Sequence, residues 1–260
     1  MKDLLFSFLV ILSLYILTAE SSDISASSCN DDTKINGSQS RNIDNLLPKL
    51  VSGTIQNGFI ATSIGRGRDK VYGLAQCRGD VNSSDCYSCI EEAAKEIRNS
   101  CPNQSDARIW YDYCFLRYAA SHEFFGEVDT TGVYFYNIDN VTDPGVFNTK
   151  LGALMDRISL EAVKKPSSKG LGKGKSDVSE FVRLYALVQC TRDLSAISCA
   201  QCLAIGISNF SRFCGNKKGC RVLYSSCYVR YELYPFFFPL ESFIITSTSP
   251  KYERVMAVGN

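Results

Sequence analysis

The chain of 260 residues contains one histidine, His122, and one tryptophan. A metal site built on imidazoles has no second histidine, and a Ser/His/Asp triad would depend on His122 alone. No excess charge of either sign is present, since 28 Lys and Arg face 27 Asp and Glu, which argues against a nucleic-acid-binding tail. What remains is a globular chain, 45% hydrophobic, with 12 cysteines. We expect no enzyme activity, no cofactor, no metal and no nucleic-acid partner.

Long hydrophobic runs are also scarce. The apolar run from Leu4 to Leu17 follows Lys2, precedes the small residue Ala19, and is short for a membrane span. This pattern predicts a cleaved signal peptide over residues 1–19 and no transmembrane anchor. A secreted chain with an even number of cysteines is expected to form disulfides.

Asn-x-Ser/Thr sequences agree with secretion. The chain has five candidate glycosylation sites, although each motif is common by chance: Asn36, Asn82, Asn103, Asn140 and Asn209.

The cysteines reveal a tandem duplication. Ten of them form two sets of five, separated throughout by 113 residues: Cys77, Cys86, Cys89, Cys101 and Cys114, then Cys190, Cys199, Cys202, Cys214 and Cys227. Cys29 and Cys220 have no equivalent at this offset. Each half nevertheless holds six cysteines, enough for three disulfides within each half.

The periodicity predicts helices and antiparallel strands in each half, which is an α+β class. Apolar residues of 43–57 have helical spacing, and Pro48 suggests a helix that starts near Asn45. A second helix is expected after Ser84 or Asp85. The expected strands of the first half and the linker after it are Val71–Cys77, Arg108–Trp110, Tyr113–Tyr118 and Val133–Asn137.

The spacing Cys-x8-Cys-x2-Cys, present twice, resembles plant cysteine-rich repeat secretory proteins and the ectodomains of cysteine-rich receptor-like kinases. Their unit is the ginkbilobin-like, or salt-stress response/antifungal, domain. The sequences around Cys101 and Trp110 in the first half, and around Arg221 and Arg230 in the second, are similar to this family. The resemblance implies two helices packed on an antiparallel sheet of about five strands. It divides the chain into domain 1 (27–140), domain 2 (145–240) with a flexible Lys/Gly-rich internal loop (164–177), and a C-terminal tail (241–260).

The family resemblance also implies the disulfide pairing. It gives Cys29–Cys101, Cys77–Cys86, Cys89–Cys114, Cys190–Cys199 and Cys202–Cys227. The second half departs from many relatives, since Phe213 occupies one cysteine position and Cys220 replaces a glycine. These five pairs use ten of the twelve cysteines, so Cys214 and Cys220 remain as the sixth pair. Taken alone, the Cys-x-x-Cys pairs would also allow redox chemistry or zinc binding, which secretion disfavours.

A mannose pocket is the site that the resemblance implies. In the family it uses an Asn after the first cysteine, an Arg and a Glu. Domain 1 has Asn30 and Arg108 but Ala119 in place of Glu, and domain 2 has Arg221 and Glu232 but no matching Asn. These four residues are therefore incomplete candidates, and the alternative is that both arginines pair with neighbouring carboxylates.

Charge is distributed unevenly. Residues 20–148 hold 11 basic and 18 acidic residues, whereas residues 149–260 hold 16 and 8. Five of the positive charges lie in one segment: Lys164, Lys165, Lys169, Lys173 and Lys175. The asymmetry suits docking of the two halves, or attraction of the basic segment to an anionic cell-wall polymer or a membrane surface.

Together these features predict a protein secreted to the apoplast that binds a cell-wall glycan or an extracellular protein in stress or pathogen defence. The alternatives are a directly antifungal effector and a soluble, truncated ectodomain of a cysteine-rich receptor-like kinase.

Overall fold

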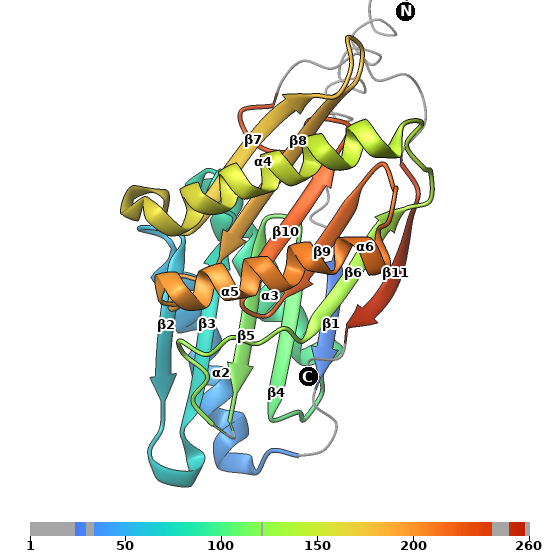
Figure 1. Ribbon diagram of the computed structural model, residues 1–260. Helices are drawn as coiled ribbons and strands as arrows, with labels where there is room; N and C mark the ends of the chain where they lie inside the picture. Colours follow the sequence, from blue (N-terminus) through green and yellow to red (C-terminus); the bar gives the residue numbers. More distant parts are fainter. Residues whose placement is uncertain (1–23, 30–33, 121, 241–249, 258–260) are drawn as a thin grey trace, which may run out of the picture.

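The computed structural model describes residues 24–29, 34–120, 122–240 and 250–257. The expected signal peptide (1–19) and Asn30 lie outside this part of the chain. The described residues form two α+β units, each an antiparallel sheet with two long helices on one face (Figure 1).

The first sheet has five strands in the order β1-β4-β5-β3-β2. Their bounds are β1 Ile24–Cys29, β2 Phe59–Ile64, β3 Val71–Cys77, β4 Asp106–Tyr111 and β5 Cys114–Ala119. Helices α2 (Gly37–Thr54) and α3 (Ser83–Ser100) cover one face of this sheet, and the short helix η1 (Gly67–Asp69) joins β2 to β3.

The second sheet has six strands in the order β11-β6-β9-β10-β8-β7. Their bounds are β6 Gly132–Asn137, β7 Leu171–Asp177, β8 Arg183–Cys190, β9 Cys220–Tyr224, β10 Cys227–Glu232 and β11 Tyr252–Ala257. Its helices are α4 Pro144–Lys164, η2 Pro166–Ser168, α5 Ala196–Ser208 and α6 Phe210–Phe213. The expected α+β class and disulfide-stapled repeat are therefore confirmed, with a sixth strand supplied by the C-terminal segment.

Both helix starts in the first unit differ from the sequence prediction. Helix α2 begins eight residues before Asn45, because Asn36 and Gln39 form a capping box, and Pro48 lies within the helix. Helix α3 is capped by Asn82, which accepts a hydrogen bond from the backbone of Asp85. An asparagine cap satisfies an amide of the first turn, so each helix starts where such a side chain is available.

The prediction of a flexible loop over 164–177 is wrong for its second half, which forms strand β7 along the edge of the sheet. Glycine alternates with lysine there, and the glycines face helix α4. A Cβ atom on Gly172 would lie 1.9 Å from the carbonyl oxygen of Ile158. Glycine is therefore needed for strand and helix to approach this closely, and the pattern replaces the usual apolar alternation.

The domain boundary also lies earlier than predicted. Strand β6 pairs with β9 of the second sheet, so residues 132–140 belong to the second unit and not to the first. The tail expected over 241–260 includes β11, which pairs with β6 in register from Tyr252–Asn137 to Ala257–Gly132.

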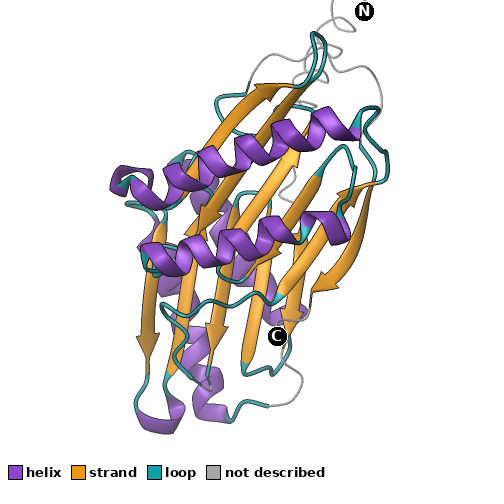
Figure 2. Ribbon diagram, in the orientation of Figure 1, coloured by secondary structure: helices purple, strands orange, loops and turns teal. Residues whose placement is uncertain are grey.

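The two units pack with their sheets facing each other. In Figure 2 the helices of the second unit lie in front of the second sheet, and the helices of the first unit lie behind the first sheet. Where the sheets overlap, Trp110 and Ala26 of the first contact Val133 and Leu223 of the second in a small apolar cluster. Four layers result, with a seam between the two sheets at the centre of the molecule.

Candidate functional site

Arg108, a sugar-binding candidate, lies in a buried ion-pair cluster of the first sheet. Its Nη2 lies 3.1 Å from Asp106 Oδ2 and 2.9 Å from Asp129 Oδ2, and Arg117 binds the same two carboxylates. Burial, and then the charge of Arg117, lower the pKa of Arg108 from its ordinary value. Only 8% of Arg108 is exposed, so its guanidinium is directed into the protein.

Arg221 and Glu232, the candidates of the second unit, form a cluster that crosses the seam. Glu232 is completely buried, and its Oε1 accepts from Nε of Arg221 at 3.3 Å and of Arg230 at 2.9 Å. Arg221 Nη1 also reaches Asp112 of the first unit at 3.0 Å. The ring of Tyr252, on β11, lies 4.7 Å from the Arg221 guanidinium. This arginine therefore joins the two units and the C-terminal strand.

Of the four sugar-binding candidates the structure describes three, and it does not bring Arg108 together with Arg221 and Glu232. Arg108 and Arg221 occupy equivalent strands, β4 and β9, of different sheets. Asp143, at the position equivalent to the missing asparagine, caps helix α4 through the backbone of Val146. The alternative interpretation, that the arginines pair with carboxylates, describes their observed contacts.

All twelve cysteines are in disulfides: five pairs are those that the family resemblance implies, and the sixth, Cys214–Cys220, is the one left by counting. The pairs are Cys29–Cys101, Cys77–Cys86, Cys89–Cys114, Cys190–Cys199, Cys202–Cys227 and Cys214–Cys220. In each Cys-x-x-Cys motif both sulfur atoms bond to cysteines elsewhere in the chain, so neither the redox nor the zinc interpretation applies to these motifs.

The glycosylation candidates differ in exposure. Asn36, Asn82, Asn103 and Asn140 are exposed, and the first two cap helices. Asn209 is half-buried, and its Nδ2 donates to the carbonyl oxygen of Ile205 and to the hydroxyl of Tyr224. Four of the five asparagine residues are thus exposed.

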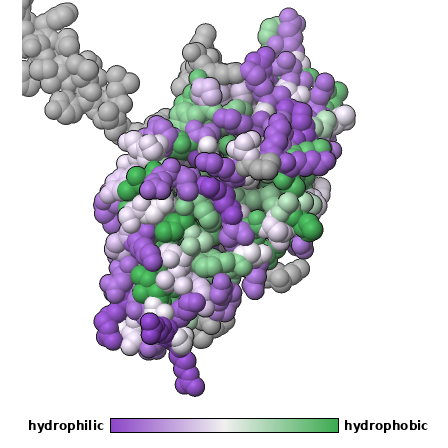
Figure 3. All heavy atoms as spheres, turned by 90° about the vertical axis from the view of Figure 1, so that its left-hand side faces the viewer, coloured by the Kyte–Doolittle hydropathy of each residue, from purple (hydrophilic) through white to green (hydrophobic). Residues whose placement is uncertain are grey.

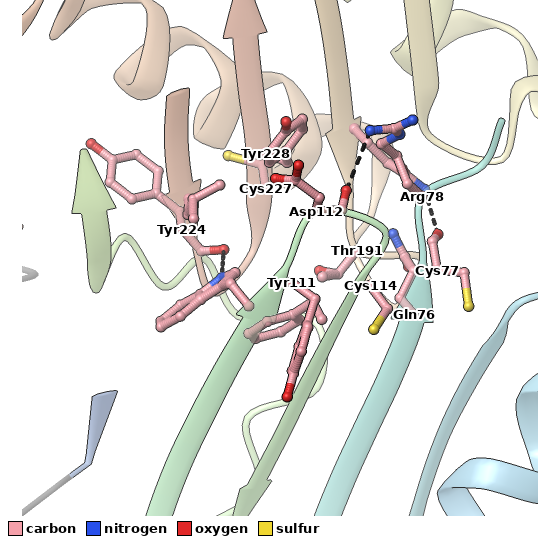
Figure 4. Close-up of a pocket in the computed structure, with 14 residues that line it drawn as sticks. Gln76, Cys77, Arg78, Tyr111, Asp112, Cys114, Thr191, Tyr224, Cys227 and Tyr228 are labelled. Atoms are coloured by element: carbon pink, nitrogen blue, oxygen red, sulfur yellow. Dashed lines mark hydrogen bonds between the residues drawn. The ribbon is translucent and has the colours of Figure 1, made fainter. Parts of the chain in front are cut away.

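The seam between the units contains a small cavity of about 50 Å³ (Figure 4). Trp110 Nε1 donates across it to the carbonyl oxygen of Tyr224 at 3.2 Å. Beside it, Arg78 pairs with Asp80 at 2.6 Å and donates to the carbonyl oxygen of Phe236. A cavity of this size is too small for a sugar ring, and its side chains hold the two units together.

A larger cleft of about 610 Å³ opens at one end of the seam. Two equivalent turns line it, Thr54–Gly58 from the first unit and 167–171 from the second, each leading from a helix into an edge strand. The side chain of Gln189 reaches the cleft from β8. Figure 3 shows this side of the molecule, where hydrophilic residues are interspersed with small apolar patches.

The cleft is polar and basic. Among the residues that line it, Glu161 supplies the one carboxylate. Five side chains are cationic: Arg78, Lys165, Lys169, Lys173 and Arg192. Hydroxyl and amide groups accompany them, from Ser83, Gln56 and Asn57 among others. Such groups, which offer hydrogen-bond donors and acceptors of fixed direction, are suited to a polar ligand.

The lysines of the cleft stand out in the sequence as a basic segment, whereas no local sequence pattern marks Arg192 or the cleft itself. Arg192 follows Cys190 closely, and at the 113-residue offset it lies over Gly79. That change from glycine to arginine between the two repeats is a signal that a comparison of the halves could have used.

Comparison with known proteins agrees with this architecture. The profile of the salt stress response/antifungal family matches residues 27–121 and 136–234. The chain belongs to this family. Among similar members, Cysteine-rich repeat secretory protein 55 of Arabidopsis thaliana is 50% identical over 265 residues, covering 99% of this chain and 98% of that protein. An Antimicrobial ginkbilobin-2-like protein of Castanea crenata is 43% identical over 196 residues, covering 75% of this chain and 80% of that protein.

Solved structures of this salt stress response/antifungal type share the fold. The tandem DUF26 ectodomain of the Arabidopsis thaliana cysteine-rich receptor-like protein PDLP8 superposes with a TM-score of 0.69 at 29% identity, over 82% of this chain and 98% of that one. The corresponding ectodomain of PDLP5 superposes with a TM-score of 0.66 at 24% identity, over 81% of this chain and 99% of that one.

The protein is thus an extracellular, disulfide-bonded member of a family of cysteine-rich secretory proteins. No helix in the described part of the chain combines the length and apolarity needed to cross a bilayer.

Proposed function

We propose that this member of the salt stress response/antifungal family acts as an extracellular binding protein, without catalysis, and that its ligand is a carbohydrate held in the cleft between the two domains. The role would be in stress or pathogen defence, as the family description and the name of the Castanea crenata relative suggest.

The observation that carries the proposal is the composition and position of the cleft. About 610 Å³ of space lies between two turns that come from different domains, and hydroxyl, amide and cationic side chains line it. Ligand sites often lie between domains and have volumes in this range. A sugar presents many hydroxyl groups, each of which needs a donor or an acceptor when water is removed.

The mannose pocket implied by the family receives less support from the observed geometry. Arg108 and Glu232 are buried, and each forms ion pairs inside the protein. A sugar at either position would have to break an ion pair before it could bind.

A glycan array with the purified, disulfide-bonded protein tests the proposed function. We expect retention of a limited set of plant or fungal glycans, and loss of that retention when Arg192 is replaced by Gln. An array without any bound glycan would overturn the proposal. It would favour the second candidate, a protein partner, for which the extracellular ectodomain fold shared with the receptor-like protein PDLP8 is the supporting observation.

A further inference from the structure

Resting on the proposed function, we infer that the cleft selects an acidic carbohydrate, with carboxylates of uronic-acid residues bound by Lys169 and Arg192. This assigns a charge and a chemical class to the ligand of the cleft.

Arg192 is held in place by hydrogen bonds and a ring contact, and none of these contacts is with a carboxylate. Its backbone amide donates to Gln76 Oε1 at 2.9 Å, and its Nη1 donates to the carbonyl oxygen of Asn57 at 2.7 Å. The guanidinium lies 5.1 Å from the centre of the Phe59 ring. Within the described residues it forms no ion pair. A fixed guanidinium with open N–H groups is well suited to a planar carboxylate.

The lysines on the facing turn extend the positive charge. Lys169 is exposed, has a backbone φ of +53°, and forms no ion pair in the part of the chain that the structure describes. The ammonium of Lys173 contacts the carbonyl oxygen of Phe238 and the ring of Phe237. Lys165 has one distant carboxylate partner, Glu161, at 3.8 Å. The cleft therefore has more positive charge than its own residues neutralise.

Comparison of the repeats shows that the second unit supplies most of this charge. At the 113-residue offset Gln56 corresponds to Lys169, and Gly79 corresponds to Arg192. The two domains thus present equivalent turns to the same space, one neutral and one cationic. A ligand bridging them can place hydroxyl groups against the neutral turn and carboxylates against the cationic one.

The shape of the site favours a saccharide over a membrane. The cations line a recessed space, together with the side chains of Ser167, Ser168 and Asn57. A lipid surface is flat and would contact protruding groups, whereas a chain of acidic sugars can enter a cleft. Hydroxyl and amide groups beside the cations suit the ring hydroxyls of such a chain.

The test compares trigalacturonic acid with its methyl ester, which has the same rings and no negative charge. By calorimetry we expect binding of the acid, with roughly tenfold or greater weakening for the ester. Affinity for the acid should fall as salt rises from about 0.01 M to about 0.15 M, where the screening length shortens from ~30 to ~8 Å.

Two double variants locate the site. Lys169→Gln with Arg192→Gln removes two positive charges from the cleft, and Lys164→Gln with Lys175→Gln removes two from the same basic segment outside it. We expect a roughly tenfold or larger loss of affinity for the first and a change below about twofold for the second. The melting temperature of each variant verifies that it is folded.

Several outcomes would overturn the acidic-sugar inference while leaving the proposed function intact. These are equal binding of acid and ester, and array hits restricted to neutral glycans. Equal losses in the two double variants would show attraction by overall charge and would also overturn it. Binding to phosphatidylserine vesicles, with none to the trisaccharide, would assign the charge to membranes instead. The absence of any glycan ligand would refute both proposals.

Discussion

Gln76 and Gln189 make reciprocal hydrogen bonds across the seam between the two domains. Gln76 Nε2 donates to the carbonyl oxygen of Cys190 at 2.9 Å, and Gln189 Nε2 donates to that of Cys77 at 3.3 Å. Their Oε1 atoms accept from the backbone amides of Arg192 and Gly79. Every partner is related to its counterpart by the 113-residue repeat, so the duplicated halves meet about an approximate twofold axis.

We expect the hydrogen bonds of Gln76 and Gln189 to stabilise the docking of the two domains. Replacing either glutamine with Ala leaves a buried carbonyl and a backbone amide without partners. We expect each variant to lose roughly 2–3 kcal/mol of unfolding free energy, since a buried unpaired group costs about 1–3 kcal/mol. Chemical denaturation measures the loss, and Gln56→Ala, on the exposed turn, is the control. Losses no greater than in the control would show that the seam does not depend on this pair.

The disulfides should differ in their contribution to stability according to the loops they close. Cys29–Cys101 spans 72 residues and Cys214–Cys220 spans six. We expect paired Ser substitutions to cost about 4 kcal/mol for the first and about 2 kcal/mol for the second, because a longer loop restricts the unfolded chain more. Denaturation gives the order, and thiol titration of the native protein should find no free cysteine. A reversed order would mean that native packing outweighs loop length.

Mannose should bind weakly or not at all. Each half lacks one member of the sugar-binding set, and Arg108 and Arg221 are occupied by carboxylates. Calorimetry with mannose and mannan measures this. Saturable binding that Arg108→Ala abolishes would contradict the prediction and show that the Asp129 ion pair opens for a ligand.

Asn209 should remain unglycosylated although its sequence motif is complete. Its Nδ2, the atom that a glycan would modify, already donates to Ile205 and Tyr224 in a half-buried position. Mass spectrometry of glycopeptides from protein made in plant cells tests this, with the exposed Asn140 as the comparison. A glycan on Asn209 in most molecules would refute the prediction and imply that modification precedes folding of this turn.

Low pH should weaken the ion pairs of the Arg108 cluster, because the carboxylate of Asp129 becomes protonated. Burial raises the pKa of this carboxyl, but Arg108, Arg117 and the amide of Thr131 outweigh burial and hold the pKa below its usual value. A carboxyl whose pKa is depressed by folding stabilises the native state above its unfolded pKa of about 4, and that contribution is lost as the pH falls through the folded value.

The Asp129→Asn variant tests this pH dependence. We expect it to be less stable than the original protein at pH 7, by roughly 2–4 kcal/mol for a broken buried ion pair. The difference should shrink as the pH falls below about 4, because the original carboxyl then becomes neutral as well. Thermal melts at a series of pH values measure it. A difference that is constant down to pH 2 would show that the charge of Asp129 does not contribute.

Much of the fold follows from local sequence signals. The strand of Val71–Cys77 agrees with its prediction, because β-branched and aromatic side chains suit a buried sheet. The start of α2 could have been found from Asn36 and Gln39, which form a capping box, but Pro48 misleadingly suggested a later start. Strand β7 escaped detection because its inward residues are glycines, which leave no apolar alternation to read.

The spacing of the cysteines indicated the duplication, and the family resemblance added five of the six disulfides and the fold class, because a repeat of 113 residues and a shared cysteine pattern can be read from order along the chain. The Cys214–Cys220 pair followed only from counting, and the structure confirms it. Which surfaces the two halves present to each other was decided only by the tertiary structure. Arg192 lies beside Asn57 because the two domains dock through Gln76 and Gln189. Lys169 and Lys173 line the same cleft because β7 packs on α4. The contacts between Gln76 and Arg192 and between Asn57 and Arg192 join different domains, and the contact of β7 with α4 joins two separate elements, so no local pattern records them.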